Sequence, residues 1–193
     1  MTAAHPHDTE VTSRALAARD GDHAALEEFI RATQRDVWRF VAHLAGTAAA
    51  DDMAQETYLR AVRSLSGFRG RSSARTWLLA IARRVVIDQF RRDSVRPSLA
   101  GVDDWRLTAE RAQPTGLPGV DEAVALGDLL ARIDDDRREA FVLTQMLRLT
   151  YPEAAEVCGC PVGTIRSRVA RARDDLAGML DDERRDSGAC SAG

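Results

Sequence analysis

The residues with the clearest chemistry in this sequence are its arginines, which gather in two blocks. All 27 basic residues are Arg. Residues 59–92 hold nine of them against one acid, Asp88, and residues 162–173 hold four and no acid. Because guanidinium groups bind phosphate oxygens in bidentate geometry, each block could bind the backbone of a nucleic acid. The blocks therefore indicate two such surfaces, although solvated helix faces in an arginine-rich chain would give the same pattern.

The net charge of −3 conceals these blocks. Acidic flanks compensate for them, since residues 1–58 sum to −5 and residues 120–161 also sum to −5. Salt screens each charge beyond about 10 Å, so a nucleic-acid binder needs local positive charge and not a high overall isoelectric point.

Other chemistries fit the sequence poorly. The acidic residues of 51–56 together with His43 could form a metal-dependent active site, yet the four His are scattered and no nucleophile accompanies them. Cys158 and Cys160 lack the second ligand pair of a structural zinc site. We therefore predict no enzyme, no metal and no cofactor.

Three cysteines outside any paired framework indicate a reduced, cytoplasmic setting.

The composition favours packed helices, because only 5% of the residues are aromatic while 45% are hydrophobic. No stretch of 18 apolar residues occurs, so we predict no membrane span. The first residues also lack the basic and apolar segments of a secretory signal.

The segment from Thr150 to Arg173 has the pattern of a helix-turn-helix. Thr150 and Glu153 form a capping box at the start of a short helix. Gly159 lies where a tight turn needs a positive φ, and Pro161 helps to start the next helix. We expect Cys158 and Cys160 to pack beside this turn, and a redox role for them stays open.

The second helix of this motif has two different faces. Its apolar face comprises Ile165, Val169, Ala172 and Leu176. Its opposite face comprises Gly163, Ser167, Ala170 and Arg171, flanked by Arg166. Small residues allow a helix to enter the major groove, where Arg can bind guanine O6 and N7. Arg168 and Arg173 are expected to contact phosphate or solvent. A plain helical hairpin with a charged exterior is the alternative.

Helical periodicity predicts the elements that position these residues. The predicted helices span about 22–45, 49–65, 74–92, 120–133, 135–148, 151–158 and 162–180. The second has Met53, Leu59, Val62 and Leu65 facing inward. The third has Trp77 in the core, although Trp77 and Phe90 could instead stack on bases. We predict an all-α fold of two small helical domains joined by a flexible linker. Its parts are a disordered tail (1–19), a first domain (20–93), the linker (94–119), a second domain with the helix-turn-helix (120–181) and a disordered tail (182–193).

Three blocks of sequence together resemble the extracytoplasmic-function (ECF) sigma factors of RNA polymerase. They are DDMAQETYLRAVR from residue 51, SARTWLLAIAR from residue 73 and CPVGTIRSRVARAR from residue 160. The blocks occur in the family's order and spacing, and the resemblance covers about 20–180. It implies a protein that binds core RNA polymerase, directs it to −35/−10 promoters and melts the −10 region. Many relatives carry Asn where this chain has Arg84, which leaves the base choice at −10 open.

The resemblance also implies roles for individual residues. The clamp helices of the polymerase's largest subunit would be bound by Asp51, Asp52, Gln55 and Glu56. An extruded base of the −10 element would be held by a loop and the helix after it, through Phe68, Arg69, Arg71, Ser72, Ser73, Arg75, Arg84, Arg91 and Arg92. The −35 element would be read by Thr164, Arg166, Ser167, Arg168, Ala170 and Arg171.

The partners implied are core polymerase, including the flap of its second-largest subunit, promoter DNA and an anti-sigma factor. The main alternative is a helix-turn-helix regulator that binds duplex operator DNA without core polymerase. Its first domain would then sense a signal or dimerise.

Overall fold

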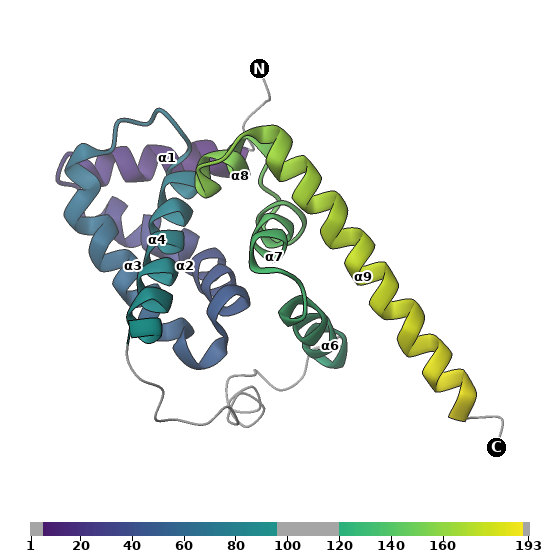
Figure 1. The fold of residues 1–193 in the computed structure, drawn as a ribbon. Helices are drawn as coiled ribbons and strands as arrows, with labels where there is room; N and C mark the ends of the chain where they lie inside the picture. The colour runs from purple at the N-terminus through teal and green to yellow at the C-terminus, as the bar shows by residue number, and fades with distance from the viewer. Residues whose placement is uncertain (1–5, 96–119, 191–193) are drawn as a thin grey trace. The chain divides into compact units, whose positions relative to one another are not determined.

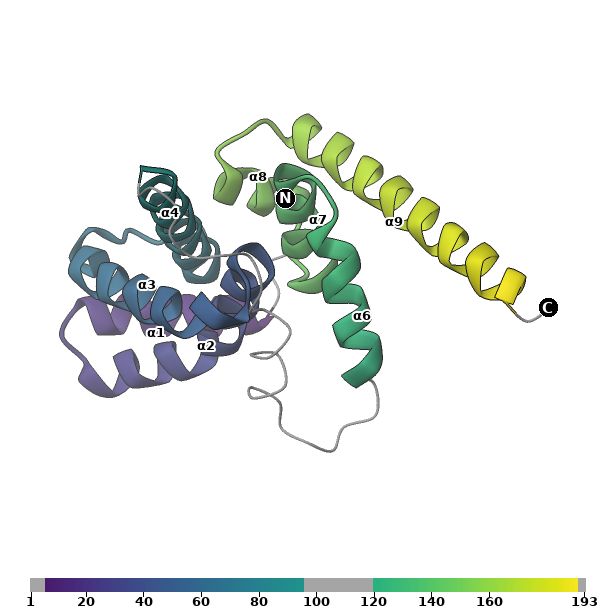
Figure 2. The same cartoon turned by 60° about the horizontal axis from the view of Figure 1, so that its bottom comes forward.

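The computed structural model describes residues 6–95 and 120–190, with side chains for 8–93 and 126–181. Within these ranges the regular structure is helical and no strand occurs, which confirms the predicted all-α fold (Figures 1 and 2). The chain divides into two compact units, one formed by the N-terminal helices and the other by most of the C-terminal helices. The linker predicted at 94–119 lies almost wholly outside the described residues.

The first unit packs α1 (Pro6–Arg19), α2 (His23–Ala45), α3 (Ala50–Ser64) and α4 (Ala74–Val95) around one core. The turns η1 (Thr47–Ala49) and η2 (Leu65–Gly67) flank α3. Asp22 caps α2, because its carboxylate accepts a hydrogen bond from Ala25 N at 3.0 Å. The largest side chains that this core buries completely are Phe29, Phe40, Leu78 and Leu79.

Helix α1 replaces most of the disordered tail predicted for residues 1–19, so that prediction was wrong. The helix buries Val11 and Ala15 completely and packs along α2. A stripe of small side chains gives little periodic signal in a sequence, yet it allows two helices to approach closely. The packing with α2 and α4, and not the helix's own composition, explains why this segment is ordered.

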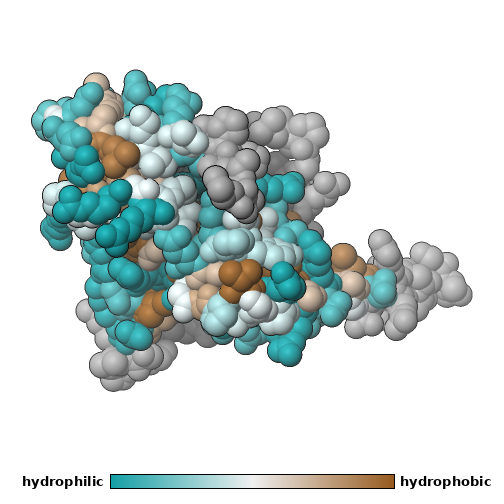
Figure 3. Space-filling model, turned by 90° about the horizontal axis from the view of Figure 1, so that it is seen from above, coloured by the Kyte–Doolittle hydropathy of each residue, from teal (hydrophilic) through white to brown (hydrophobic). Residues whose placement is uncertain are grey.

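The face that α3 turns inward also differs from the prediction. Met53 and Leu65 are buried as expected, whereas Leu59 and Val62 are 46% and 45% exposed. The helix instead buries the small residue Ala61 and Thr57, whose hydroxyl donates to the Met53 carbonyl at 2.7 Å. Leu59 and Val62 therefore contribute apolar surface to an exterior that is mostly hydrophilic. Figure 3 shows this mixture of large hydrophilic areas and small hydrophobic patches.

The second unit contains α6 (Val120–Ala131), α7 (Asp135–Phe141), the π-helical turn η3 (Val142–Met146), α9 (Val162–Cys190) and the first part of α8 (Tyr151–Cys158). The helix predicted at 135–148 thus changes its geometry halfway, because Leu147 N donates to the Val142 carbonyl five residues back, at 2.9 Å. The tail predicted from 182 was wrong up to Cys190, since the backbone of α9 continues that far. Its polar composition favours solvation, but no proline interrupts the helix.

Arg148 adopts a strained backbone conformation, with a φ of 61°, at the turn between η3 and α8. We predict that Arg148→Gly raises the free energy of unfolding by about 1 kcal/mol, because glycine has no Cβ to clash in the left-handed region. Chemical denaturation of the whole chain measures the change. Arg148→Ala is the matched control, since it removes the same side chain but keeps the Cβ. Equal stabilities of the Gly and Ala variants would contradict strain at this position.

Tyr58 of α3 is hydrogen-bonded to Thr33 of α2, with 2.9 Å between their hydroxyl oxygens. Burial raises the pKa of Tyr58 to about 12. Between pH 10 and 12 the unfolded chain therefore loses the Tyr58 proton first, and stability falls as the pH rises. We expect the unfolding free energy to drop by about 1 kcal/mol more between pH 9 and pH 11 in the wild type than in Tyr58→Phe. Urea denaturation at both pH values tests this, and equal drops would contradict it.

Candidate nucleic-acid interface

The helix-turn-helix predicted from Thr150 onwards is present as α8 and α9. The capping box is formed, since Thr150 N donates to Glu153 Oε2 at 2.8 Å and Glu153 N donates to Thr150 Oγ1 at 3.4 Å. Gly159 has a φ of 65° in the turn, as its position predicts. The turn is closed by Cys160 N, which donates to the Ala155 carbonyl at 3.1 Å.

Helix α9 separates its apolar and polar faces as the sequence predicts. Ile165, Val169 and Ala172 are completely or almost completely buried. The opposite face is solvent-exposed and comprises Gly163, Arg166, Ser167, Ala170 and Arg171. Thr164 is partly buried at the start of this face. The first turns of α9 therefore present a convex, narrow surface with two outward arginines, which has the form of a major-groove reading helix.

Two other arginines of α9 bind the helices beneath it. Arg168 is paired with Asp136 of α7 and also donates to Cys160 Sγ at 3.8 Å. Arg173 donates to Gln145 Oε1 of η3 at 2.7 Å. Arg168 was predicted to be a −35 contact, but in this structure its guanidinium helps to fix α9 on α7.

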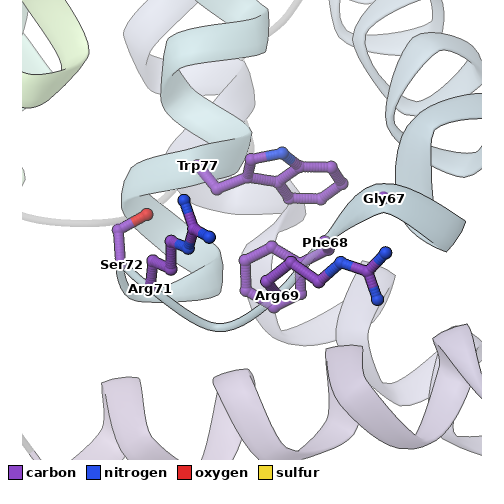
Figure 4. Close-up of a pocket in the computed structure, with 6 residues that line it drawn as sticks. All are labelled: Gly67, Phe68, Arg69, Arg71, Ser72 and Trp77. Atoms are coloured by element: carbon purple, nitrogen blue, oxygen red, sulfur yellow. The ribbon is translucent and has the colours of Figure 1, made fainter.

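In the first unit, a pocket lies beside the loop of residues 68–73, which connects η2 to α4. It is an open hollow of about 260 Å³, lined by Gly67, Phe68, Arg69, Arg71, Ser72 and Trp77. The Trp77 indole and the Phe68 ring lie 4.9 Å apart between centroids, tilted by 38°. In Figure 4 these rings lie across from each other, with Arg69 on one side and Arg71 and Ser72 on the other. Trp77 is thus partly exposed, and not wholly in the core as predicted.

Three residues predicted to contact the −10 element also hold this region together. Phe68 is only 4% exposed. The Ser73 hydroxyl accepts a hydrogen bond from Thr76 N at 3.0 Å and so caps α4. The Arg75 guanidinium binds the Asp36 carboxylate at 2.6 Å and lies 3.8 Å from the carboxylate of Asp8.

One face of α4 extends away from the pocket. Trp77, Arg84 and Arg91 are seven residues apart, so they follow one another along the same side of the helix. Arg84 and Arg91 are exposed, as is Arg92, while Ala80 lies between Trp77 and Arg84. The pocket is thereby continued by positive side chains at the spacing of two helical turns.

The acidic residues predicted to bind polymerase lie together on α3. Asp51, Asp52 and Gln55 are exposed, and Glu56 is partly exposed. Arg60 binds the carboxylates of Glu56 at 2.7 Å and of Asp88 in α4 at 2.5 Å. The hydrogen bonds from Arg60 lower the pKa of both carboxyl groups.

Leu59 and Val62 share the stripe of α3 that carries Asp52 and Gln55, because these positions recur in steps of three and four. Both residues were predicted to lie in the core, so their place on this surface was not foreseen. A helical projection that places Thr57 and Ala61 inward puts Leu59 and Val62 on the exposed side of α3. The stripe therefore combines acidic, amide and exposed apolar side chains.

Nothing in the described parts of the chain resembles a metal centre, since no group of three or more His, Cys, Asp or Glu side chains lies close enough together there. No described helix has the length and hydropathy needed to cross a membrane.

Comparisons with known proteins match both units. The family model for Sigma-70 region 2 matches residues 29–96, and that for Sigma-70 region 4 matches residues 123–176. The ECF RNA polymerase sigma factor SigC of Mycobacterium tuberculosis is 51% identical over 183 residues, which cover 91% of this chain and 94% of SigC. The chain belongs to the ECF sigma factors.

Two solved structures share the fold. The chain of the sigma factor RpoE, in its co-crystal structure with the anti-sigma factor NepR from Bartonella quintana, is 27% identical with a TM-score of 0.63. That match covers 81% of this chain and 96% of RpoE. CnrH, solved in complex with the cytosolic domain of CnrY, is 24% identical with a TM-score of 0.70, over 90% of this chain and 98% of CnrH.

Family membership confirms the resemblance found in the sequence. It also decides between the two main interpretations, because an operator-binding regulator would have no reason to match sigma region 2. Sigma factors are in general transcription initiation factors and not enzymes. This ECF sigma factor is thus an alternative sigma factor that directs RNA polymerase.

Proposed function

We propose that the first unit of this sigma factor captures an unpaired base of the −10 element in the pocket that Phe68 and Trp77 help to line. The observation that carries the proposal is this pocket, with aromatic rings on its floor and Arg69 and Arg71 at its edge. Stacking on an aromatic ring compensates for the cost of removing a base from the duplex, a few kcal/mol. The exposed guanidinium groups would bind the phosphates on either side.

The strand would then follow α4, where Arg84 and Arg91 continue the positive surface beyond the pocket. Arg92 extends this surface at the helix end. Arg84 stands where many relatives carry Asn, and its long cationic side chain suits a phosphate contact better than reading of a base edge. Ser72 would supply a hydroxyl at the pocket wall, while Ser73 and Arg75 would keep the loop in place.

The helix-turn-helix would read the −35 element in the major groove. Arg166 and Arg171 point outward from α9, beside the small residues Gly163 and Ala170, which permit close approach to the bases. The Ser167 hydroxyl donates to the Thr164 carbonyl at 2.9 Å, and its oxygen can still accept a bond from DNA. Arg168 would support the helix from behind.

Core polymerase would bind the acidic and apolar stripe of α3. Asp51, Asp52 and Gln55 offer charge and hydrogen-bond acceptors, while Leu59 and Val62 offer apolar area that binding would remove from water. Glu56 binds Arg60, which also binds Asp88 of α4. Glu56 would therefore support the contact between α3 and α4 as well as the interface with polymerase. The flap of the second-largest subunit would bind the second unit.

An anti-sigma factor is a further proposed partner. RpoE of Bartonella quintana was crystallised with the anti-sigma factor NepR, and we propose that this chain is held inactive by a protein of that class. We also propose that it acts in the cytoplasm, where its polymerase is, and has no catalytic activity of its own.

Substitution of Arg171 tests reading of the −35 element. Arg171→Ala should lower promoter affinity by roughly 1–3 kcal/mol and relax the preference at one −35 position. Arg171→Lys is the matched variant, because it keeps the charge but loses the bidentate geometry. Binding of holoenzyme to a set of single-base promoter variants measures both effects. An equal loss on every variant would show that Arg171 contacts phosphate alone.

Reversal of one charge on α3 tests the polymerase surface. Asp52→Arg should weaken binding to core polymerase at least tenfold and reduce run-off transcription, since it puts a cation in the acidic stripe. Glu27→Arg is the control, because Glu27 is equally exposed on α2, outside the stripe. A fluorescence titration with core enzyme measures the affinity. If both variants bound core enzyme like the wild type, the assignment of α3 would fail.

A further inference from the structure

Helix α1 has no part in the functions described so far. The match to Sigma-70 region 2 starts at residue 29, after α1 has ended at Arg19. Yet α1 packs against both η2 and α4, the two elements that flank the pocket loop. Its side chains meet this loop at both ends and in the middle.

Two hydrogen bonds connect α1 to the backbone at the ends of the loop. At the first end, Arg19 Nη1 donates to the Phe68 carbonyl at 3.3 Å. At the other end, Ala74 N donates to Thr12 Oγ1 at 3.0 Å. The Thr12 hydroxyl in turn donates to the Asp8 carbonyl at 2.7 Å. This hydrogen bond within α1 orients the hydroxyl, so that its oxygen can accept the bond from Ala74 N.

Two packing contacts complete the attachment. Gly70, with a φ of 67°, lies over Leu16, and a Cβ there would be 3.6 Å from Leu16 Cδ1. Beyond the loop, the Arg75 guanidinium lies 3.8 Å from the Asp8 carboxylate, and both side chains are largely buried. Helix α1 therefore contacts the loop at Phe68 and Gly70, and the start of α4 at Ala74 and Arg75.

These contacts involve the loop that forms part of the pocket. One wall, which includes Phe68, Arg71 and Ser72, belongs to the loop, whereas Trp77 belongs to α4. The loop itself has no regular secondary structure between η2 and α4. Besides the burial of Phe68 and the Ser73 cap, the bonds from Arg19 and Thr12 therefore help to set the separation of its two ends.

We infer that α1 is a positioning element for capture of the −10 strand, with Thr12 and Arg19 as the residues that hold the loop in its binding conformation. The inference rests on the proposed function of the pocket. A loop that is ordered before it binds loses less conformational entropy on binding, so its affinity for the strand is higher. Loss of either bond should weaken strand capture without changing the other surfaces.

If α1 only stabilised the core, substitutions that remove its contacts with α2 or with the loop would have the same effect on strand binding. Val11 and Ala15 already bury the helix in the core, and Arg14 attaches it to α2 through Glu28 at 3.2 Å. Arg14 and Arg19 lie on the same helix and are similarly exposed, but only Arg19 binds the loop. Arg14→Met is therefore the matched control for Arg19→Met, and Thr12→Ser is the conservative counterpart of Thr12→Val.

The experiment uses holoenzyme reconstituted from full-length variants and core polymerase. The probe is a fluorescent single strand that carries the non-template −10 element of a promoter transcribed by the wild type. We expect binding to be about fivefold weaker for Arg19→Met and about tenfold weaker for Thr12→Val, which also leaves the buried Ala74 amide unpaired. Arg14→Met and Thr12→Ser should bind like the wild type. Affinities for core enzyme and for −35 duplex should not change.

Hydrogen exchange of the free chain gives a second measurement that does not depend on DNA. Amides of residues 68–75 should exchange faster in Arg19→Met and Thr12→Val, while those of α2 and α3 keep their protection. Faster exchange throughout the first unit would show that the substitutions had loosened the whole core, and would overturn the inference.

Arg71→Ala separates failure of this inference from failure of the proposed function, because Arg71 is an exposed residue of the pocket itself. If Arg71→Ala binds the strand like the wild type, the proposed pocket fails and the inference fails with it. If Arg71→Ala loses binding while Arg19→Met and Thr12→Val keep it, only the role of α1 is overturned. Equal losses in Arg14→Met and Arg19→Met would also overturn it.

Discussion

Burial of one stripe of each helix is the constraint on which the surfaces of this protein depend. When Ile165, Val169 and Ala172 of α9 are packed in the second unit, the rotation of the helix is fixed. Arg166 and Arg171 must then point outward, whatever they bind. The same holds for α4, where burial of Leu78 directs the opposite side of the helix to solvent. Hydrophobic packing, at about 25 cal/mol per Å² of apolar surface, thus orients the polar residues that contact partners.

Ion pairs divide the arginines into two groups. Arg60, Arg75 and Arg168 bind carboxylates of neighbouring helices and so attach one helix to another. Arg71 and Arg171 lie exposed on the two surfaces proposed to contact DNA. A guanidinium already bound to a carboxylate has fewer donors for a phosphate and would have to break that bond first. The number of arginines in a block therefore overstates the number that can contact nucleic acid.

Much of the fold could be predicted because strong periodicity and caps are local properties of the sequence. The limits of α2, α3 and α8 agree with the prediction to within about two residues, and the capping box and the positive φ of Gly159 are both present. Prediction failed for α1 and for the inward face of α3. The buried stripe includes Ala15 in α1 and Thr57 and Ala61 in α3, and small or polar residues of this kind resemble surface positions in a sequence. Only their packing partners show that they are inside.

The all-α class, the family, the two arginine blocks and the acidic helix follow from the sequence alone, because each depends on residue types at fixed spacing. The tertiary structure decided which of those residues are available to a partner. It placed Ser73 in a helix cap, bound Arg75 to Asp36 and exposed Leu59 and Val62 beside the acidic residues. It also brought α1 against the two ends of a loop that lie 49 and 62 positions further along the chain. Contacts of that kind depend on which helices pack together, and no local pattern of residues encodes them.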